Sequence, residues 1–200
     1  MKISLLVPAF LFVTMFSNSQ QLMNGDFERW RDTVKSLVPL YWSPDLRASL
    51  HYSPSIQAQQ GKYALVLSTW YSYVEGHLHY GNFHEPAYER WTDYTVPFTG
   101  KPLKLTGYYR YTDPVNFTDS AGGQVLIKDT KGDTLAYGFV LLDTAVNWTS
   151  FEIPLTYKSA KAAKSIAVHF TSRMAGGGMN DDSYPNRLWL DNLKFLYKKP

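Results

Sequence analysis

Histidines gather in the segment EGHLHYGNFHEP, which holds His77, His79 and His84. On a strand His77 and His79 share one face, because successive side chains point to opposite faces. Three imidazoles beside Glu75 or Glu85 are ligands that zinc accepts. A histidine pair on an exposed strand face also occurs without a metal, and its ring nitrogens can then hydrogen-bond the hydroxyl groups of a sugar. The segment leaves both interpretations open, a metal site and a sugar-binding face.

Aromatic residues are unusually frequent: 15 tyrosines, 6 tryptophans and 11 phenylalanines make up 16% of the chain. A buried tyrosine hydroxyl needs a hydrogen-bond partner, so we expect several tyrosines to lie at the surface. In the segment GYYRY, Tyr108 and Arg110 share one strand face, and this face is the better candidate for a ligand. Aromatic rings can stack on the CH face of a sugar while polar groups bind its hydroxyls. The candidate carbohydrate-binding residues are Trp70, Tyr73, His77, His79, Trp91 and Arg110.

Two acidic residues far apart in the sequence are candidates for a shared calcium ion. Glu28 lies in NGDFERW and Asp191 lies in RLWLDNLKFLY. Calcium needs several oxygen ligands, which carboxylates and loop carbonyls supply. Alternatively, the two side chains cap turns or pair with Arg29 and Arg187. Both interpretations stay open, and a structural calcium is the one cofactor that the sequence suggests.

No catalytic pair of carboxylates stands out in the sequence. A glycosidase needs one protonated and one ionised carboxylate at a fixed separation, which a sequence does not show. The motifs Gly-x-Ser-x-Gly and His-Glu-x-x-His are absent, and so is a glycine-rich phosphate loop before a helix. The sequence therefore favours a non-catalytic protein and leaves open whether the chain is an enzyme. Acids in or near predicted loops are Glu75, Glu85, Glu89, Asp93, Asp113 and Asp119.

Charge and cysteine content exclude further classes. The formal net charge is +3, and the lysines and arginines are scattered singly. A nucleic-acid-binding protein usually concentrates them in a stripe, so we expect no nucleic-acid partner. The chain has no cysteine, which excludes disulfides, thiolate metal sites and a cysteine nucleophile.

The first residues have the pattern of an export signal. An apolar run follows Lys2 and ends before Ser17 and Ser19, the small residues of a cleavage site. The run is short for a membrane span, and no later segment is long enough to cross a bilayer. We expect residues 1–19 to be a signal peptide and residues 20–200 to form a single domain that is periplasmic, cell-surface or extracellular. An uncleaved anchor helix is the alternative.

The elements that would position these residues are β-strands. Alternating and aromatic-rich runs recur, separated by Gly, Pro, Asn and Asp, and no convincing helix follows the leader. KDTKGDTLAYGF predicts a hairpin around its Lys-Gly-Asp turn. In RLWLDNLKFLY the apolar residues change face after Leu190, which predicts a bulge at Asp191-Asn192. The expected strands are 25–30, 49–52, 62–73, 76–80, 94–98, 103–112, 122–129, 133–142, 149–156, 164–171 and 187–197.

Six motifs follow one another along the chain after the leader: NGDFERW, GKYALVLST, VPFTGKPLKLTGYYRYTDP, WTSFEIPLTY, SIAVHFTSR and LWLDNLKFLY. In these motifs the chain resembles the family of carbohydrate metabolism domains in secreted Gram-negative bacterial proteins. The resemblance covers nearly all of the chain after the leader, and it implies a jelly-roll β-sandwich. The first and last motifs are also similar to jelly-roll carbohydrate-binding modules, in which a structural calcium lies near the matching positions.

We therefore predict an all-β protein, an antiparallel β-sandwich of jelly-roll, galactose-binding-like type. The expected function is that of a secreted, non-catalytic carbohydrate-binding or glycan-processing accessory protein, with a glycan or polysaccharide as its partner. One alternative is a jelly-roll glycoside hydrolase or polysaccharide lyase. Another is a structural or adhesion domain that binds a protein partner through a flat apolar patch. The sequence leaves the oligomeric state open.

Overall fold

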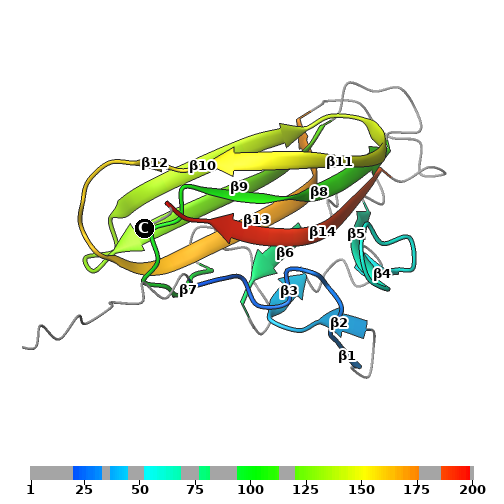
Figure 1. Ribbon diagram of the computed structural model, residues 1–200, viewed down its shortest axis with the longest axis horizontal. Coiled ribbons are helices and arrows are strands. Elements are labelled where there is room, and N and C mark those ends of the chain that lie inside the picture. The colour runs from blue at the N-terminus through cyan, green and yellow to red at the C-terminus, as the bar shows by residue number, and fades with distance from the viewer. Residues whose placement is uncertain are drawn as a thin grey trace, which may run out of the picture.

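The computed structural model describes residues 20–32, 37–44, 52–68, 77–81, 94–112, 120–175 and 186–198. These residues form β-strands, turns and loops, and two sheets pack against each other as layers (Figure 1). No helix within these residues has the length and apolar character that a membrane crossing needs.

Some strand bounds follow the alternating sequence pattern closely. The predicted strand 103–112 is observed as β8, and 187–197 is observed as β14. The strands are β1 (Trp30–Asp32), β2 (Leu37–Pro39), β3 (Trp42–Pro44), β4 (Tyr52–Ser55), β5 (Ala64–Ser68), β6 (His77–Tyr80), β7 (Val96–Pro97), β8 (Lys104–Thr112), β9 (Ser120–Asp129), β10 (Thr134–Leu142), β11 (Ala145–Pro154), β12 (Thr156–Tyr157), β13 (Ala163–Ala175) and β14 (Arg187–Leu196). The strands β2 and β3 fall where no strand was predicted, and β11 begins four residues before the predicted 149–156.

The strand order is that of a jelly-roll sandwich. The seven-stranded sheet runs β12-β10-β9-β13-β6-β3, with β7 paired to β13, and the five-stranded sheet runs β11-β8-β14-β5-β4. The chain passes repeatedly from one sheet to the other, and every strand pair in the described residues is antiparallel. The predicted all-β, antiparallel jelly-roll sandwich is confirmed.

The core lies between the two sheets. Along β8 buried and half-buried residues alternate, as the period of a strand with one face inward requires. Phe151 of β11 meets Phe170 of β13 across the core, with ring centroids 5.9 Å apart in an edge-on arrangement. Full burial of such a side chain contributes about 1.5–3 kcal/mol relative to exposure.

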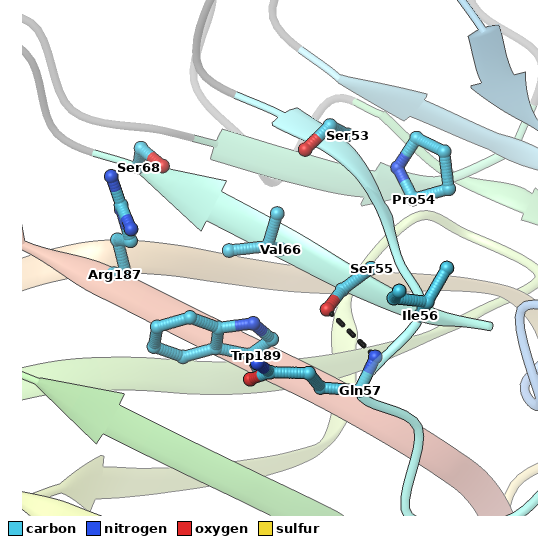
Figure 2. A pocket seen from close by; sticks show the side chains of 9 residues that line it. All are labelled: Ser53, Pro54, Ser55, Ile56, Gln57, Val66, Ser68, Arg187 and Trp189. Carbon is cyan, nitrogen blue, oxygen red and sulfur yellow. Dashed lines mark hydrogen bonds between the residues drawn. The ribbon is translucent and has the colours of Figure 1, made fainter.

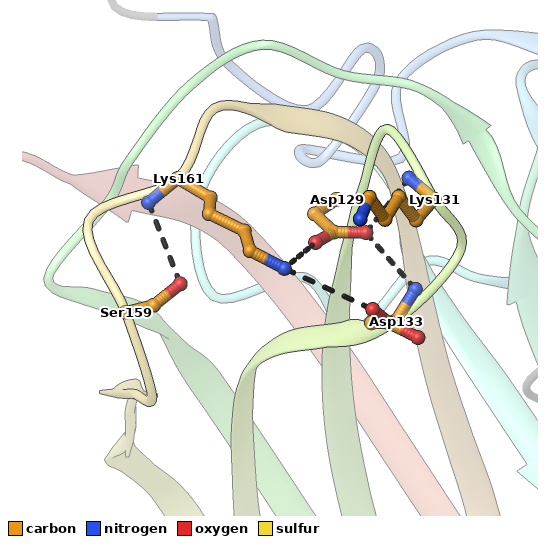
Figure 3. A network of polar contacts seen from close by, with 5 residues as sticks. All are labelled: Asp129, Lys131, Asp133, Ser159 and Lys161. Carbon is orange, nitrogen blue, oxygen red and sulfur yellow. Dashed lines mark hydrogen bonds and ion pairs between the residues drawn. The ribbon is translucent and has the colours of Figure 1, made fainter.

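The predicted hairpin around Lys-Gly-Asp is confirmed and joins β9 to β10. Its turn is built on the buried Asp129 carboxylate, whose Oδ1 accepts hydrogen bonds from the N–H groups of Lys131 (2.8 Å) and Asp133 (3.0 Å). Lys161 donates to the other oxygen at 2.7 Å, so the hairpin is tied to the loop before β13 (Figure 3). Gly132 has φ of 86°, a left-handed conformation that favours glycine.

The predicted strand 25–30 is wrong. Residues 23–26 form a turn, and β1 begins only at Trp30 and pairs with β2 outside the two layers (Figure 1). Asn24 (φ 54°) and Phe27 (φ 51°) are left-handed, and this conformation is incompatible with an extended strand.

The Asn24 side chain holds this turn together. It donates hydrogen bonds to the carbonyl oxygens of Arg29 (2.9 Å) and Leu40 (3.0 Å) and accepts one from the Arg29 N–H. The turn places the Phe27 ring in the core, where it is fully buried 5.5 Å from the Trp42 ring. A turn, and not the predicted strand, therefore places Phe27 in the core.

Candidate functional site

Glu28 and Asp191 hold one loop between them. Asp191 lies at the predicted bulge of β14, which is confirmed by a register shift after this residue and by Asn192 at φ 54°. Asp191 Oδ2 accepts hydrogen bonds from the N–H groups of Gln59 (2.8 Å) and Gln60 (3.2 Å).

Glu28 binds the other end of the same loop. Its Oε1 accepts hydrogen bonds from the N–H groups of Lys62 (2.7 Å) and Tyr63 (2.9 Å). Gly61, at φ 79°, brings the loop backbone so close that a Cβ there would collide with Glu28 Oε1. Both carboxylates therefore accept hydrogen bonds from loop N–H groups, as the alternative interpretation, that they cap turns, predicts.

The two carboxylates have the donor chemistry that a hard cation prefers. Asp191 is fully buried, which raises the pKa of its carboxyl, and the charge of Glu28 raises this pKa further while three backbone N–H groups lower it. Among the described residues no group of three or more His, Asp or Glu side chains lies close enough to hold a metal ion. Loop carbonyls or water would have to supply the remaining oxygens of a six- to eight-coordinate calcium.

His77 and His79 share the outer face of β6, as their spacing predicts, and His169 of β13 joins them. The His77 Nδ1 and the His169 Nε2 are 3.0 Å apart, and the His79 ring stacks on the His169 ring with centroids 4.8 Å apart. These rings lie nearly parallel and do not converge on one point, so these three histidines do not form a zinc site. His84 lies outside the described residues.

The histidine stack is less exposed than the sequence suggests. His79 is only 6% exposed, and the Tyr94 ring packs against it at 4.7 Å. Burial lowers the pKa of His79 to about 3, with a smaller contribution from the charge of His77, and burial likewise lowers the pKa of His169. Both rings are neutral at pH 7, and only His77 is half-exposed.

An aromatic stripe lies on the same outer face of the seven-stranded sheet. Tyr137, Phe139 and Leu141 alternate along β10 and are 40%, 40% and 48% exposed. Their neighbours Ala136 and Gly138 point inward, where a Cβ on Gly138 would already meet Ile153 and Leu155. Side chains from other strands thus fill the core on the inner side of β10, and the large side chains of β10 lie on its outer face.

Gln124 of β9 places polar groups beside this stripe. Its Oε1 accepts a hydrogen bond from the Tyr137 hydroxyl at 3.3 Å, and its Nε2 lies 3.7 Å from the Met174 sulfur. In the sheet register Gln124 stands opposite Phe139 on one side and His169 on the other. Phe139, Gln124 and His169 therefore lie in one row on the outer side of this sheet, although His169 is itself buried.

Arg110 lies on the other sheet. It projects from β8 on the outer face of the five-stranded sheet, with its guanidinium 5.0 Å from the centroid of the Trp189 ring. The predicted carbohydrate-binding residues are therefore divided, with His77 and His79 on one outer face and Arg110 on the opposite one. Trp70, Tyr73 and Trp91 lie outside the described residues.

Sequence reasoning missed Tyr137, Phe139 and Gln124. The signal was present in the segment TLAYGFVLL, where large residues alternate with Ala136 and Gly138. Period-two alternation shows that the large residues share a face, yet it does not show which face is inward. The opposing strands decide that direction, and they are distant in sequence.

Comparison with known proteins finds similar structures at low sequence identity. TmCBM61, solved in complex with β-1,4-galactotriose, is 14% identical over 90% of this chain and 100% of its own, with a TM-score of 0.46. The family 11 carbohydrate-binding module of the cellulosomal cellulase Lic26A-Cel5E of Clostridium thermocellum is 14% identical over 90% of this chain and 96% of its own, with a TM-score of 0.46. The Stig cyclase Fisc from Fischerella sp. TAU is 10% identical over 87% of this chain and 94% of its own, with a TM-score of 0.49.

These likenesses are too distant to assign a ligand or an activity to this chain. No protein-family model matches the chain, and no curated protein matches its sequence.

Proposed function

We propose that this chain binds carbohydrate on the outer face of the seven-stranded sheet. Tyr137 and Phe139 would stack on the CH faces of sugar rings, while Gln124 and the half-exposed His77 would hydrogen-bond the hydroxyls. The observation that carries the proposal is the exposed aromatic pair on one face of β10 with a polar amide beside it.

The arrangement has the composition of a ligand surface. Ligand sites combine aromatic side chains with a few placed polar groups, and exposed apolar stripes on a sheet mark interaction surfaces. Side chains two residues apart on a strand are about 7 Å apart, so Tyr137 and Phe139 can contact neighbouring parts of one extended chain. A stacked ring contributes about 0.5–1.5 kcal/mol, so a single site would be weak and would gain from several copies.

We further propose that the protein is exported and acts as a non-catalytic accessory protein. None of the described side chains named on this face is a carboxylate, whereas a glycosidase needs two of them at a fixed separation. The acids in or near the predicted loops lie outside the described residues, and so does the signal peptide expected at residues 1–19.

A separate proposal concerns a calcium ion, at a different place in the structure. We propose that Glu28 and Asp191 share a calcium ion that stabilises the loop which they hold. Two carboxylates that face one loop, one of them buried, support it, because a divalent cation would relieve their mutual repulsion.

The test of carbohydrate binding is a glycan array followed by calorimetric titration of the best oligosaccharide. We expect Tyr137→Ala and Phe139→Ala each to weaken binding up to about tenfold, equivalent to about 1.4 kcal/mol. Val146→Ala, an exposed apolar residue on the other sheet, is the matched control and should keep the wild-type affinity.

Two outcomes would overturn the proposal. One is a folded protein that binds no neutral or charged glycan. The other is binding of a neutral oligosaccharide that survives the double variant Tyr137→Ala, Phe139→Ala. Capture of a protein partner that the same double variant abolishes would instead favour the adhesion alternative, because Leu141 extends the stripe as an apolar patch.

A further inference from the structure

A pocket of about 540 Å³ opens on the outer face of the five-stranded sheet, across the sandwich from the aromatic stripe. Its floor is Val66 and Trp189, and its wall is formed by Ser53 and Ser55 of β4 (Figure 2). The volume lies in the range of small-molecule sites, about 300–1,000 Å³.

Three strands, β4, β5 and β14, line this pocket, and the sheet register places β8 beside them. Ser53 of β4 stands opposite Val66 of β5, Val66 opposite Trp189 of β14, and Trp189 opposite Arg110 of β8. Residues in one such row point to the same face, so the serine hydroxyl, the apolar floor and the guanidinium share the outer surface. The backbone of the central strands therefore fixes their spacing.

Arg110 supports the rim of the pocket. Its Nε donates to the carbonyl oxygen of Val146 at 2.9 Å, and its Nη1 donates to Gln57 Oε1 at 3.0 Å. The Gln57 N–H in turn donates to Ser55 Oγ at 3.2 Å (Figure 2). With its guanidinium also over the Trp189 ring, Arg110 is occupied by the protein itself and positions Gln57.

Arg187 is the charged group that remains for a ligand. It lies opposite Ser68 in the register, and Figure 2 shows both side chains at one end of the pocket. Within the part of the chain that the structure describes, the exposed Arg187 side chain forms no ion pair and no hydrogen bond, and none of the residues that line the pocket is acidic. A guanidinium is charged at every physiological pH and matches a carboxylate with two parallel N–H donors.

We propose that this pocket binds an acidic saccharide unit, with its carboxylate on Arg187, its ring on the floor of Val66 and Trp189, and its hydroxyls facing Ser53 and Ser55. This site goes beyond the carbohydrate-binding face proposed above, because it lies on the other sheet and selects for negative charge. A uronic acid has the three features that the pocket matches: a carboxylate, an apolar CH face and several hydroxyls.

The test uses calorimetric titration of the whole purified protein with an oligogalacturonate and with the same oligomer methyl-esterified. The ester keeps the sugar and removes the charge, so we expect its affinity to be at least tenfold lower. Arg187→Gln should lower the affinity for oligogalacturonate at least tenfold. Ser53→Asp leaves Arg187 unchanged and adds to the wall a negative charge that repels the ligand's carboxylate. It should give a similar loss of affinity for oligogalacturonate.

The controls separate this site from general charge attraction and from the aromatic stripe. Lys131→Gln removes one positive charge at the β9–β10 turn, and we expect it to keep the affinity within twofold. Equal losses for Arg187→Gln and Lys131→Gln would overturn the proposal, as would equal affinity for acid and ester or no binding of either. Loss of oligogalacturonate binding in Tyr137→Ala, with Arg187→Gln unaffected, would overturn this inference and support the proposed function.

Discussion

Glu28 and Asp191 accept hydrogen bonds from opposite ends of one loop. The Asp191 carboxylate accepts them from the N–H groups of Gln59 and Gln60. The Glu28 carboxylate accepts them from the N–H groups of Lys62 and Tyr63. Asp191 comes from the bulge of β14 and Glu28 from the turn that precedes β1. Two segments at opposite ends of the described chain are thus joined through backbone hydrogen bonds of a third segment.

Gly61→Ala should destabilise the protein by more than Gly132→Ala. Both glycines are left-handed, and forcing a residue with a Cβ into that conformation costs about 1–2 kcal/mol. Only at Gly61 would the new methyl group also displace the Glu28 carboxylate, since at Gly132 a Cβ meets nothing within 4 Å. Urea denaturation of both variants measures the difference, and equal losses would show that Glu28 does not matter for the loop.

Calcium should raise the melting temperature of the protein. At a concentration of about 100 times Kd, a bound ligand adds about 2.7 kcal/mol, which for a chain of this size corresponds to about 5–10 °C. Asp191→Asn should abolish the rise, a chelator should reverse it, and magnesium should not reproduce it. A melting temperature that millimolar calcium does not change would contradict the proposal of a calcium site.

Stability should fall between pH 7 and pH 5 because of the buried histidines. In the folded state the pKa of His79 is about 3 and that of His169 is also lowered, whereas in the unfolded chain both are near 6.5. Below pH 6.5 the unfolded state therefore binds protons that the folded state does not, and each buried histidine costs up to about 1.4 kcal/mol per pH unit. Stability is retained above pH 6.5 and lost as the pH falls towards 3.

His79→Gln tests this origin of the pH dependence, because glutamine is neutral at every pH. The variant should lose about half of the slope of unfolding free energy against pH, measured by urea denaturation at pH 7, 6 and 5. A slope identical to that of the wild type would mean that other groups cause the acid sensitivity.

Asp129→Asn should lower the melting temperature more than Lys161→Met. The Asp129 carboxylate is buried and caps the β9–β10 turn with two backbone hydrogen bonds, and the hydrogen bond from Lys161 lowers its pKa. The Lys161 side chain is 54% exposed, so its ion pair is screened by solvent. Asp133→Asn, whose side chain is 69% exposed and 3.8 Å from Lys161, is the control and should change little.

Long strands such as β8 were predictable because alternation is a local property, whereas the short strands β2 and β3 were not predicted. The bounds of β8 and the bulge at Asp191-Asn192 both follow from which apolar residues keep the same parity. The strand predicted at 25–30 was wrong because the turn at residues 23–26 depends on a contact that is not local. The Asn24 side chain stabilises this turn through the carbonyl oxygen of Leu40, which is 16 residues away in sequence.

The candidate sites were only partly predictable, because their composition depends on long-range register. Arg110 was singled out for its strand face, but its stacking on Trp189 depends on β14 lying beside β8. Likewise, Tyr137 and Phe139 remain outside because Ile153 and Leu155 already occupy the space inside Gly138. Neither relationship can be predicted from the residues that neighbour these positions in the sequence.

The place of β14 also determines the order in which the smaller sheet can assemble. β14 pairs with β8 on one side and β5 on the other, and all other described strands precede it in the chain. Until β14 is synthesised, the β4–β5 pair and the β8–β11 pair have no strand in common. Distant pairings of this kind are slow to form, so β14, which is made after both pairs, joins them in a late step.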